Sequence, residues 1–401
     1  MNFPPTSSAV RSLEGKQVAS RVWAFVASCL LCTLSLSAMA LAQAESVIYS
    51  FANPPDAFSP KCNLVRDTAG NMYGTTFSGG SHNLGAVFMA TPAGVESVIY
   101  NFAGGADGSH PVAGLFRDAK TGNLFGTTVY GGATNNGTVF VLNPTTGTET
   151  VLYSFKGGQD GANPYSSVVR AGTTVFGTTY NGGAFGYGTV FKVTAAGKEA
   201  VLHSFNSAFP TLDGSYPYAG LVLNKGIFYG TTTLGGASNL GTVFSITKTG
   251  SYALIYSFKG GSPDGQTPNG GVAFDKSGNI YGTTYAGGQD NAGVVYVLSG
   301  GAETVLHHFA RNGADGMNSY ASLIFIKGSF YGTTLQGGSA NAGTVFKITT
   351  SGTESVLHAF TGGADGYNPY SALVQGANNT FYSTTLVGGT SNLGTVFKLT
   401  P

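Results

Sequence analysis

Charge is scarce in this sequence. Only 9% of its 401 residues are Asp, Glu, Lys or Arg, and the formal net charge is +1. We therefore expect no nucleic-acid or anionic-membrane partner, because both select basic surfaces. Glycine is abundant instead, with 62 residues, and hydrophobic residues make up 42%, enough for a large core. This composition favours a secreted β protein whose neutral surface carries hydroxyl and amide groups.

Cysteine is almost absent. Cys29 and Cys32 lie in the first 44 residues, which differ from the rest of the chain. Cys62 is then alone, so we expect neither an intrachain disulfide nor a cysteine-based zinc site in the mature protein. We interpret Cys62 as a partly buried strand residue rather than a reactive thiol. Packing must therefore stabilise the fold.

Residues 1–44 have the three-part layout of a secretory signal peptide. Basic residues precede an apolar run over residues 22–42, and Ala42-Gln43-Ala44 is the best cleavage site. Two alternatives stay open. The apolar run is just long enough for an uncleaved membrane anchor, and Cys29 could be a lipoprotein site. We predict cleavage near Ala44, a secreted location (extracellular or periplasmic) and no membrane contact afterwards.

Amphipathic helices are not indicated anywhere after residue 44. The sequence instead repeats the motif [YF]-G-T-T, followed by a Gly-Gly pair and then by Gly-x-Val-[FY], at intervals of 50–53 residues. The last copy reads YSTT. Such a period indicates a repeat architecture. The copies begin at Tyr73, Phe125, Phe176, Tyr229, Tyr281, Tyr331 and Tyr382.

Each repeat reads as four short strands, rich in Val, Thr, Phe and Tyr and bounded by Gly, Asn or Pro. In one repeat we place them at residues 164–170, 174–180, 188–194 and 199–205. Strands that are apolar on both faces belong to sheets covered on both sides, as the blades of a propeller are. We therefore predict an all-β fold: a seven-bladed β-propeller of four-stranded antiparallel blades, formed as a single domain by residues 45–401.

The first and last repeats are incomplete. The mature chain begins with ESVIYSF (45–51), a fourth strand without the first three, and ends after a third strand at residues 394–400. We predict that these two strands pair and complete one blade from both ends of the chain. This pairing closes the ring and removes an exposed sheet edge. It also leads us to expect nothing beyond Pro401.

The pattern YGTTxxGG…GTVF…ESVLYSF resembles the GloVer-type tandem repeat of bacterial choice-of-anchor surface proteins, a kelch-like β-propeller repeat family. The resemblance covers residues 45–401. It implies export and, often, a C-terminal sorting or anchoring segment. This sequence departs from that pattern, because it ends inside the repeat at Pro401 without an apolar tail. We therefore expect release or periplasmic residence.

An active site in a propeller should break its symmetry, since one substrate needs one set of groups. Of the 17 carboxylates after residue 44, 16 recur at three repeat positions, and only Asp290 stands alone. No asymmetric carboxylate pair for glycosidase chemistry is visible. Two aspartates from different repeats could still form such a pair. We therefore predict no catalytic residue, and the enzyme hypothesis stays open as the alternative.

The best functional candidate is the aspartate of the GGxDGxxP loop. This loop joins the outer strand of one blade to the inner strand of the next, so all copies lie on one face around the central channel. A ring of carboxylates could hold cations or bind sugar hydroxyls. Asp-Gly is also a turn dipeptide, so a scaffold role is the alternative. The first copy has Asp56 without the glycines and should be the weak member. The predicted ligand-binding residues are Asp107, Asp160, Asp213, Asp264, Asp315 and Asp365.

Histidine adds no metal site to this prediction. His203, His307 and His358 occupy the fourth-strand position that Tyr holds in the other repeats. We interpret them as packing residues with a polar edge. His308 follows His307 directly and points to the opposite face of the strand, so the two cannot chelate together. We expect no cofactor, with calcium in the aspartate ring as the alternative.

The leading hypothesis is an exported, monomeric, non-catalytic propeller that binds a glycan or a cell-surface protein through the loop face around the channel. The alternatives are an extracellular polysaccharide lyase or hydrolase and a purely structural envelope protein. Residues that depart from the repeat separate these hypotheses. Such residues pooled at one side of the channel mouth would favour an enzyme. Residues scattered over the rim would favour binding or a structural role.

Overall fold

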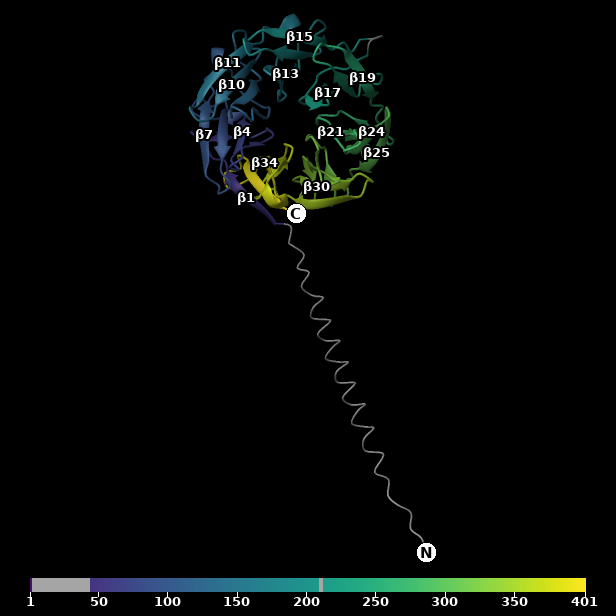
Figure 1. Cartoon of the computed structure of the whole chain (residues 1–401). Helices are drawn as coiled ribbons and strands as arrows, with labels where there is room; N and C mark the ends of the chain where they lie inside the picture. Colours follow the sequence, from purple (N-terminus) through teal and green to yellow (C-terminus); the bar gives the residue numbers. More distant parts are fainter. Residues whose placement is uncertain (2–43, 209–211) are drawn as a thin grey trace. The chain divides into compact units, whose positions relative to one another are not determined.

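The two motifs of each repeat pair with each other as the central strands of a blade. In one blade, β9 (Leu124–Thr128) runs antiparallel to β10 (Thr138–Asn143), with Gly126 opposite Phe140. A Cβ at Gly126 would lie 2.5 Å from the Phe140 ring, which explains the glycine of the GTT motif. Seven such sheets surround a central axis (Figure 1). The predicted all-β, seven-bladed propeller is confirmed.

This computed structural model describes Met1 and residues 44–208 and 212–401. Ala44–Thr400 form one compact unit. The predicted signal peptide lies outside the described residues except for its two end residues. No helix of the described residues is long and apolar enough to cross a membrane.

Six blades follow the chain from inner to outer strand. The first three contain β3 (Val65–Arg66), β4 (Met72–Thr76), β6 (Ala86–Ala90) and β7 (Glu96–Asn101); β8 (Phe116–Arg117), β9, β10 and β11 (Thr148–Ser154); and β12 (Val169–Ala171), β13 (Thr174–Thr179), β14 (Thr189–Val193) and β15 (Glu199–Ser204). The next three contain β16 (Val222–Asn224), β17 (Ile227–Thr232), β18 (Thr242–Ile246) and β19 (Tyr252–Ser257); β21 (Ala273–Phe274), β22 (Ile280–Thr283), β24 (Val294–Ser299) and β25 (Ala302–His308); and β27 (Ile324–Ile326), β28 (Ser329–Thr334), β30 (Thr344–Thr349) and β31 (Glu354–Ala359).

The seventh blade closes the ring. It contains β32 (Tyr367–Pro369), β33 (Val374–Gln375), β34 (Phe381–Val387), β35 (Thr395–Thr400) and, from the other end of the chain, β1 (Ala44–Ser50). β1 pairs antiparallel with β35, with Ala44 opposite Thr400. The amide of Phe51 extends the ladder to the carbonyl of Gly394 at 3.0 Å. The predicted closure is confirmed.

Short ladders join the Asp-Gly loop to the Gly-Gly link of the following blade. They are β2 (Ala57–Phe58) with β5 (Ser78–Gly79), β20 (Gly265–Gln266) with β23 (Ala286–Gly287), and β26 (Gly316–Met317) with β29 (Gln336–Gly337). Two other copies of the loop contain a 3-10 turn: η1 (Gly105–Asp107) and η2 (Gly158–Asp160). A third 3-10 turn, η3 (Ala377–Asn379), follows β33. The two segments touch so closely that a Cβ at Gly131 would lie 2.4 Å from the Cα of Gly108. This close packing therefore requires glycine at both Gly108 and Gly131.

The core lies between the blades rather than within them. Each outer strand is followed by a fully buried Phe, whose ring contacts the aromatic residue of the next blade's Gly-x-Val-[FY] motif edge to face. Ring centroids in these pairs are 5.0–5.3 Å apart. The pairs are Phe51–Phe88, Phe102–Phe140, Phe155–Phe191, Phe205–Phe244, Phe258–Tyr296, Phe309–Phe346 and Phe360–Phe397.

The inner strands are shorter than the sequence predicts. Residues 164–170 were expected to form a strand, but β12 begins only at Val169. Pro164 has no amide hydrogen for a ladder. After Pro164, Ser166 forms hydrogen bonds outside the ladder. Its hydroxyl lies 2.8 Å from Thr178 Oγ1, and its carbonyl accepts a hydrogen bond from Thr127 Oγ1 of the neighbouring blade. Interblade bonds thus replace the ladder near the axis.

Cys62 differs from its predicted position in burial and in secondary structure. Cys62 is fully buried in a bend rather than partly buried in a strand, and its Sγ accepts a hydrogen bond from the Thr75 amide at 3.0 Å. Burial raises the pKa of this thiol to about 11.

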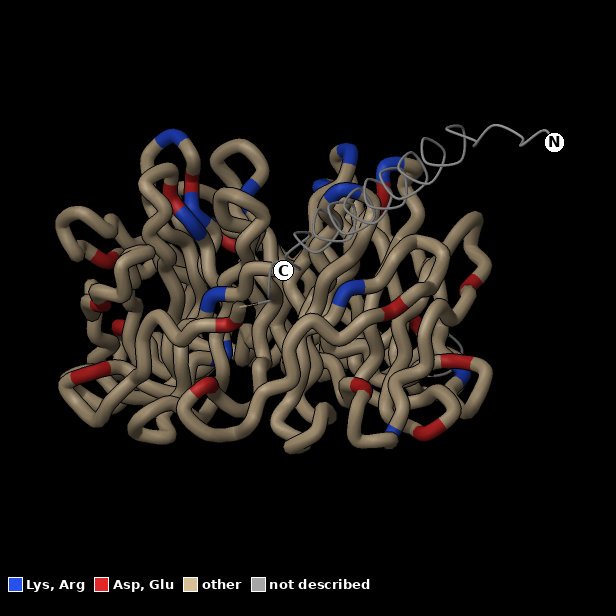
Figure 2. The backbone as a smooth tube through the Cα atoms, turned by 90° about the horizontal axis from the view of Figure 1, so that it is seen from below, with Lys and Arg blue, Asp and Glu red and all other residues tan. Residues whose placement is uncertain are grey.

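Lys and Arg predominate on the loops at one end of the ring, and Asp and Glu at the other (Figure 2).

Candidate functional site

Each predicted aspartate contacts the Tyr or His of the preceding outer strand. Asp107 accepts hydrogen bonds from Tyr100 Oη and from the Ala103 amide, both at 2.6 Å. Asp56 makes the same contacts with Tyr49 and Ala52, although its loop lacks the glycines. The equivalent ring partners are Tyr153 for Asp160, His203 for Asp213, Tyr256 for Asp264, His307 for Asp315 and His358 for Asp365.

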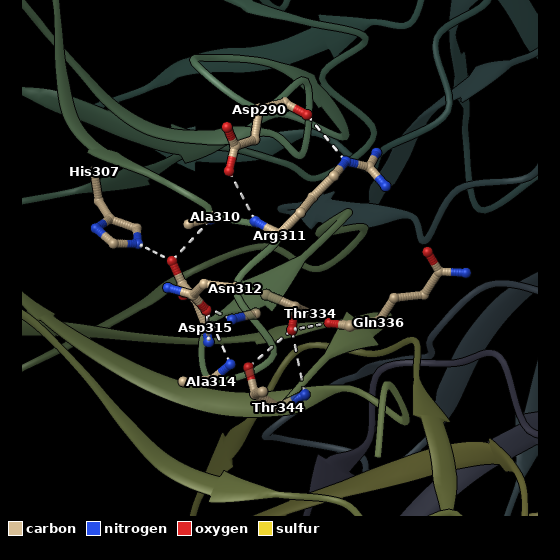
Figure 3. Close-up of polar contacts among 11 residues, drawn as sticks. Asp290, His307, Ala310, Arg311, Asn312, Ala314, Asp315, Thr334, Gln336 and Thr344 are labelled. Carbon is tan, nitrogen blue, oxygen red and sulfur yellow. Dashed lines mark hydrogen bonds and ion pairs between the residues drawn. The ribbon is translucent and has the colours of Figure 1, made fainter. Parts of the chain in front are cut away.

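Asp315 shows how these carboxylates are used (Figure 3). Its Oδ2 lies 2.9 Å from His307 Nε2 and accepts from the Ala310 amide at 2.9 Å. Its Oδ1 accepts from the Gly316 amide at 2.6 Å. Both oxygens therefore bind their own loop and the preceding strand. The structure brings each aspartate to an outer strand, not to the channel; ligand binding by these residues stays a prediction.

A glutamate from the next blade approaches each aspartate at six of the seven positions. Partial burial is the larger cause, and the negative charge of the aspartate the smaller one, of a raised pKa in these glutamates. The pKa of Glu149, beside Asp107, rises to about 7, and that of Glu199, beside Asp160, to about 8. In each of these glutamates Oε1 is buried without a hydrogen-bond partner among the described residues. The six glutamates are Glu45, Glu96, Glu149, Glu199, Glu303 and Glu354.

One of these contacts contains three potential metal ligands. Side-chain donor atoms of His307, Asp315 and Glu354 lie within 4.8 Å of one another. At the equivalent contact of Asp213, Tyr252 replaces the glutamate; it stacks on His203 with centroids 4.1 Å apart. The contacts between histidine and aspartate are thus variants of a polar contact that recurs where neighbouring blades meet.

The channel mouth is where the repeats differ. The residue after the loop proline, or after Ser319 in the sixth blade, faces the axis, and it varies around the ring. Four of the seven copies are tyrosines, and these line the channel together with Lys61. In blade order the position holds Lys61, Val112, Tyr165, Tyr218, Asn269, Tyr320 and Tyr370.

These tyrosines contact one another across the channel. Tyr218 Oη and Tyr370 Oη are 2.5 Å apart. Tyr320 stacks on Tyr370 with centroids 4.7 Å apart, and Tyr165 stacks on Tyr218 at 5.5 Å. Tyr285, just after β22, adds another aromatic ring: it lies edge to face against Tyr320, with ring centroids 5.0 Å apart. The result is an aromatic cluster at the mouth, built by loops that lead into four of the seven blades.

Two adjoining cavities flank the cluster. An outer cavity of about 240 Å³ is lined by Tyr180, Tyr285 and the polar side chains of Thr233 and Thr267. A smaller channel cavity of about 60 Å³ is lined by Lys61 and by backbone and hydroxyl groups. Tyr218, Asn269, Tyr320 and Tyr370 line both. Among the described residues, no carboxylate lines either cavity.

Burial keeps the tyrosines neutral and disfavours charge on the lysine. It raises the pKa of Tyr320 to about 12 and that of Tyr218 and Tyr370 as well. It lowers the pKa of Lys61. The mouth therefore offers neutral hydroxyl groups, which both donate and accept hydrogen bonds, beside the amino group of Lys61.

More exposed rings extend the cluster over the Gly-Gly links. Tyr130 is 37% and Phe185 is 52% exposed. Tyr187 lies edge to face against Tyr216 at 5.8 Å.

The comparisons with known proteins agree with the repeat reading. The family model described as the Gloeobacter/Verrucomicrobia repeat matches residues 36–244 and 228–401. The chain belongs to this family. The resemblance to the GloVer-type repeat is thereby confirmed. Comparison with curated proteins gives no match.

Solved structures share the fold of this Gloeobacter/Verrucomicrobia repeat protein at low identity. An oligogalacturonate lyase from Vibrio parahaemolyticus has a TM-score of 0.57 and 11% identity, covering 90% of this chain and 94% of that one. The extracellular domain of a proposed one-component system from B. thetaiotaomicron has a TM-score of 0.56 and 9% identity, covering 89% of this chain and 40% of that one. At such identities the likeness shows the propeller fold alone.

Sequence reasoning about this Gloeobacter/Verrucomicrobia repeat protein missed the tyrosines. It searched the carboxylates and histidines for departures from the repeat, and these groups recur. A signal was available: aligning the residue after each loop proline gives Tyr in some repeats and Lys, Val or Asn in others. Only the closed propeller brings these tyrosine side chains into contact.

Proposed function

We propose that this chain is an exported, non-catalytic binding protein that takes a glycan at the tyrosine-lined mouth of the channel. The tyrosine cluster carries the proposal. It departs from the repeat and lies beside a cavity that is large enough for a sugar ring. Concave sites with apolar walls and a few polar groups suit small ligands.

The chemistry of the mouth suits a sugar. The CH groups of a pyranose form an apolar face that packs on an aromatic ring, while its hydroxyls need hydrogen-bond partners. Tyr285 and Tyr320 offer ring faces and edges, and Thr233, Thr267 and Asn269 offer polar groups. A protein ligand is the alternative; the small cavity favours the glycan.

An enzyme is the second candidate, and one observation favours it: the tyrosines at the mouth depart from the repeat, as a site for one substrate would. A lyase or hydrolase also needs acid and base groups. Of the described residues that line the two cavities, Lys61 is the ionisable group other than Tyr. Because no carboxylate of the described residues lines the cavities, we favour binding. Release of shortened or unsaturated oligosaccharides from a bound polysaccharide would instead establish the enzyme.

The test is a glycan array followed by titration calorimetry. We expect at least one glycan to bind, and Tyr285→Ala and Tyr320→Ala each to weaken its binding by about 2- to 12-fold, the value of one aromatic contact. Leu254→Ala, an exposed position on the outer strand β19, is the matched control and should leave binding unchanged. Absence of any glycan ligand, or full binding by both tyrosine variants, contradicts the proposal.

A further inference from the structure

Lys61 is the cation of the channel mouth. It occupies the repeat position that Tyr holds in four other blades, and it lines the channel cavity with Tyr165, Tyr218 and Tyr370. Its Nζ lies 4.6 Å from the centroid of the Phe77 ring. Among the described residues no carboxylate forms an ion pair with it.

A half-buried ammonium without an anionic partner is costly, because burial removes its water. The lowered pKa of Lys61 records this cost. The Phe77 ring compensates only in part, since a cation over an aromatic face gains less than a full ion pair would. The aspartates cannot help, because they bind their own loops beside the outer strands. An anionic group on a ligand would supply the missing counterion.

Other residues with hydroxyl groups line the same cavity as Lys61. They are Tyr218, Ser167 and Ser322. The cavity volume of about 60 Å³ holds a few water molecules or one carboxylate, but not a sugar ring. The ring fits the outer cavity, and the two cavities adjoin at the tyrosines.

We infer that the ligand is an acidic glycan, in which one sugar ring lies against the tyrosines while its anionic group pairs with Lys61. This inference rests on the proposed function. The anionic group is a carboxylate, as in a uronic acid, or a sulfate ester. Both would restore a partner to Lys61 by a charge-assisted hydrogen bond.

The test compares three probes by calorimetry on the exported protein: tetragalacturonate, its fully methyl-esterified and therefore neutral counterpart, and a sulfated galactan oligosaccharide of equal length. We expect at least one acidic probe to bind on the order of tenfold more tightly than the neutral ester, and the preferred one to identify the anionic group. Added salt should reduce this preference.

Two lysine variants make the test specific. Lys61→Met keeps the bulk of the side chain and should remove the preference for the acidic probes. Lys61→Tyr, the residue of four other blades, repeats the test in a variant expected to fold. Lys120→Met is the control, because Lys120 lies in the turn between β8 and β9, at the opposite end of the ring, and is exposed.

The outcomes separate the two proposals. Equal affinity for acidic and neutral probes, or an unchanged preference in folded Lys61→Met, overturns the inference and leaves glycan binding standing. An equal loss in Lys120→Met also overturns it, because the attraction is then nonspecific. If no glycan binds in any arm or on the array, both proposals fall.

Discussion

The hydroxyl oxygens of Tyr218 and Tyr370 lie 2.5 Å apart, although 152 residues separate them in the chain. They belong to loops that lead into the fourth and seventh blades. Their contact bridges the channel, and both residues line the outer cavity and the channel cavity. A repeat whose copies were all alike would place one kind of residue around the axis; here the mouth has Tyr at four positions and Lys61, Val112 and Asn269 at the other three.

Removing one hydroxyl of this bridge should have a small effect on stability. Tyr218→Phe keeps the stacked ring but leaves Tyr370 Oη without this partner. We expect a loss of about 0.5–1.5 kcal/mol in the free energy of unfolding, measured by denaturant titration. Tyr382→Phe, on the second strand of the seventh blade, serves as the comparison. A loss of several kcal/mol would show that the bridge stabilises the ring rather than shapes the mouth.

Deleting residues 45–51 should destabilise the whole propeller. The seventh blade would lose β1, β35 would become an open edge, and the contact of Phe51 with Phe88 at 5.1 Å would vanish. Phe51→Ala is the milder form and should cost about 3–5 kcal/mol, as for other buried Phe residues. Thermal unfolding checks both. An unchanged melting temperature of the deletion variant would refute the role of the closure.

Asp107→Ala should lower stability without affecting ligand binding. It leaves Tyr100 Oη and the Ala103 amide without their acceptor, at a cost of about 1–3 kcal/mol. The same variant tests the prediction that the aspartate ring binds calcium. If calcium raises the melting temperature of the wild-type protein and the rise shrinks in Asp107→Ala, the carboxylates are ligands; if calcium changes neither protein, that prediction is wrong.

The interblade glutamates should make stability fall as pH rises. Burial and the adjacent aspartate raise the pKa of Glu149, Glu303 and Glu354 from 4.5 to about 7 in the folded protein. Between these values the native state holds protons that the unfolded state has released. The contribution is therefore complete below pH 4.5 and is lost as pH rises through about 7.

The measurement for this pH effect is the melting temperature at pH 5 and pH 8. Burial lowers the pKa of His110, His308 and His358, which acts in the opposite direction up to about pH 6.5. Comparison with a variant isolates the glutamates: Glu149→Gln, Glu303→Gln and Glu354→Gln together should make the pH 5 to pH 8 difference less negative. Asp290→Asn, outside the repeat, is the control. An identical pH dependence in the triple variant would contradict this account.

The sequence predicted the outer and central strands more accurately than the inner ones. Strand predictions at 174–180, 188–194 and 199–205 match β13, β14 and β15 to within a residue at each end. These strands form regular ladders, which strand propensity reports. The inner strand at 164–170 shrinks to β12, because residues near the axis bond to the neighbouring blade. Propensity within one repeat carries no information about that neighbour.

By itself, the sequence determined the number of blades, the order of their strands and the closure by β1, because each is written in a local pattern that recurs about every 51 residues. Only the tertiary structure decided which departures from the pattern meet. Tyr165, Tyr218, Tyr320 and Tyr370 are about 50 to 100 residues from their neighbours in this set and are unremarkable as single residues. The closed ring turns the same repeat position of every blade toward one axis, and so these tyrosines and Lys61 come together at the channel mouth.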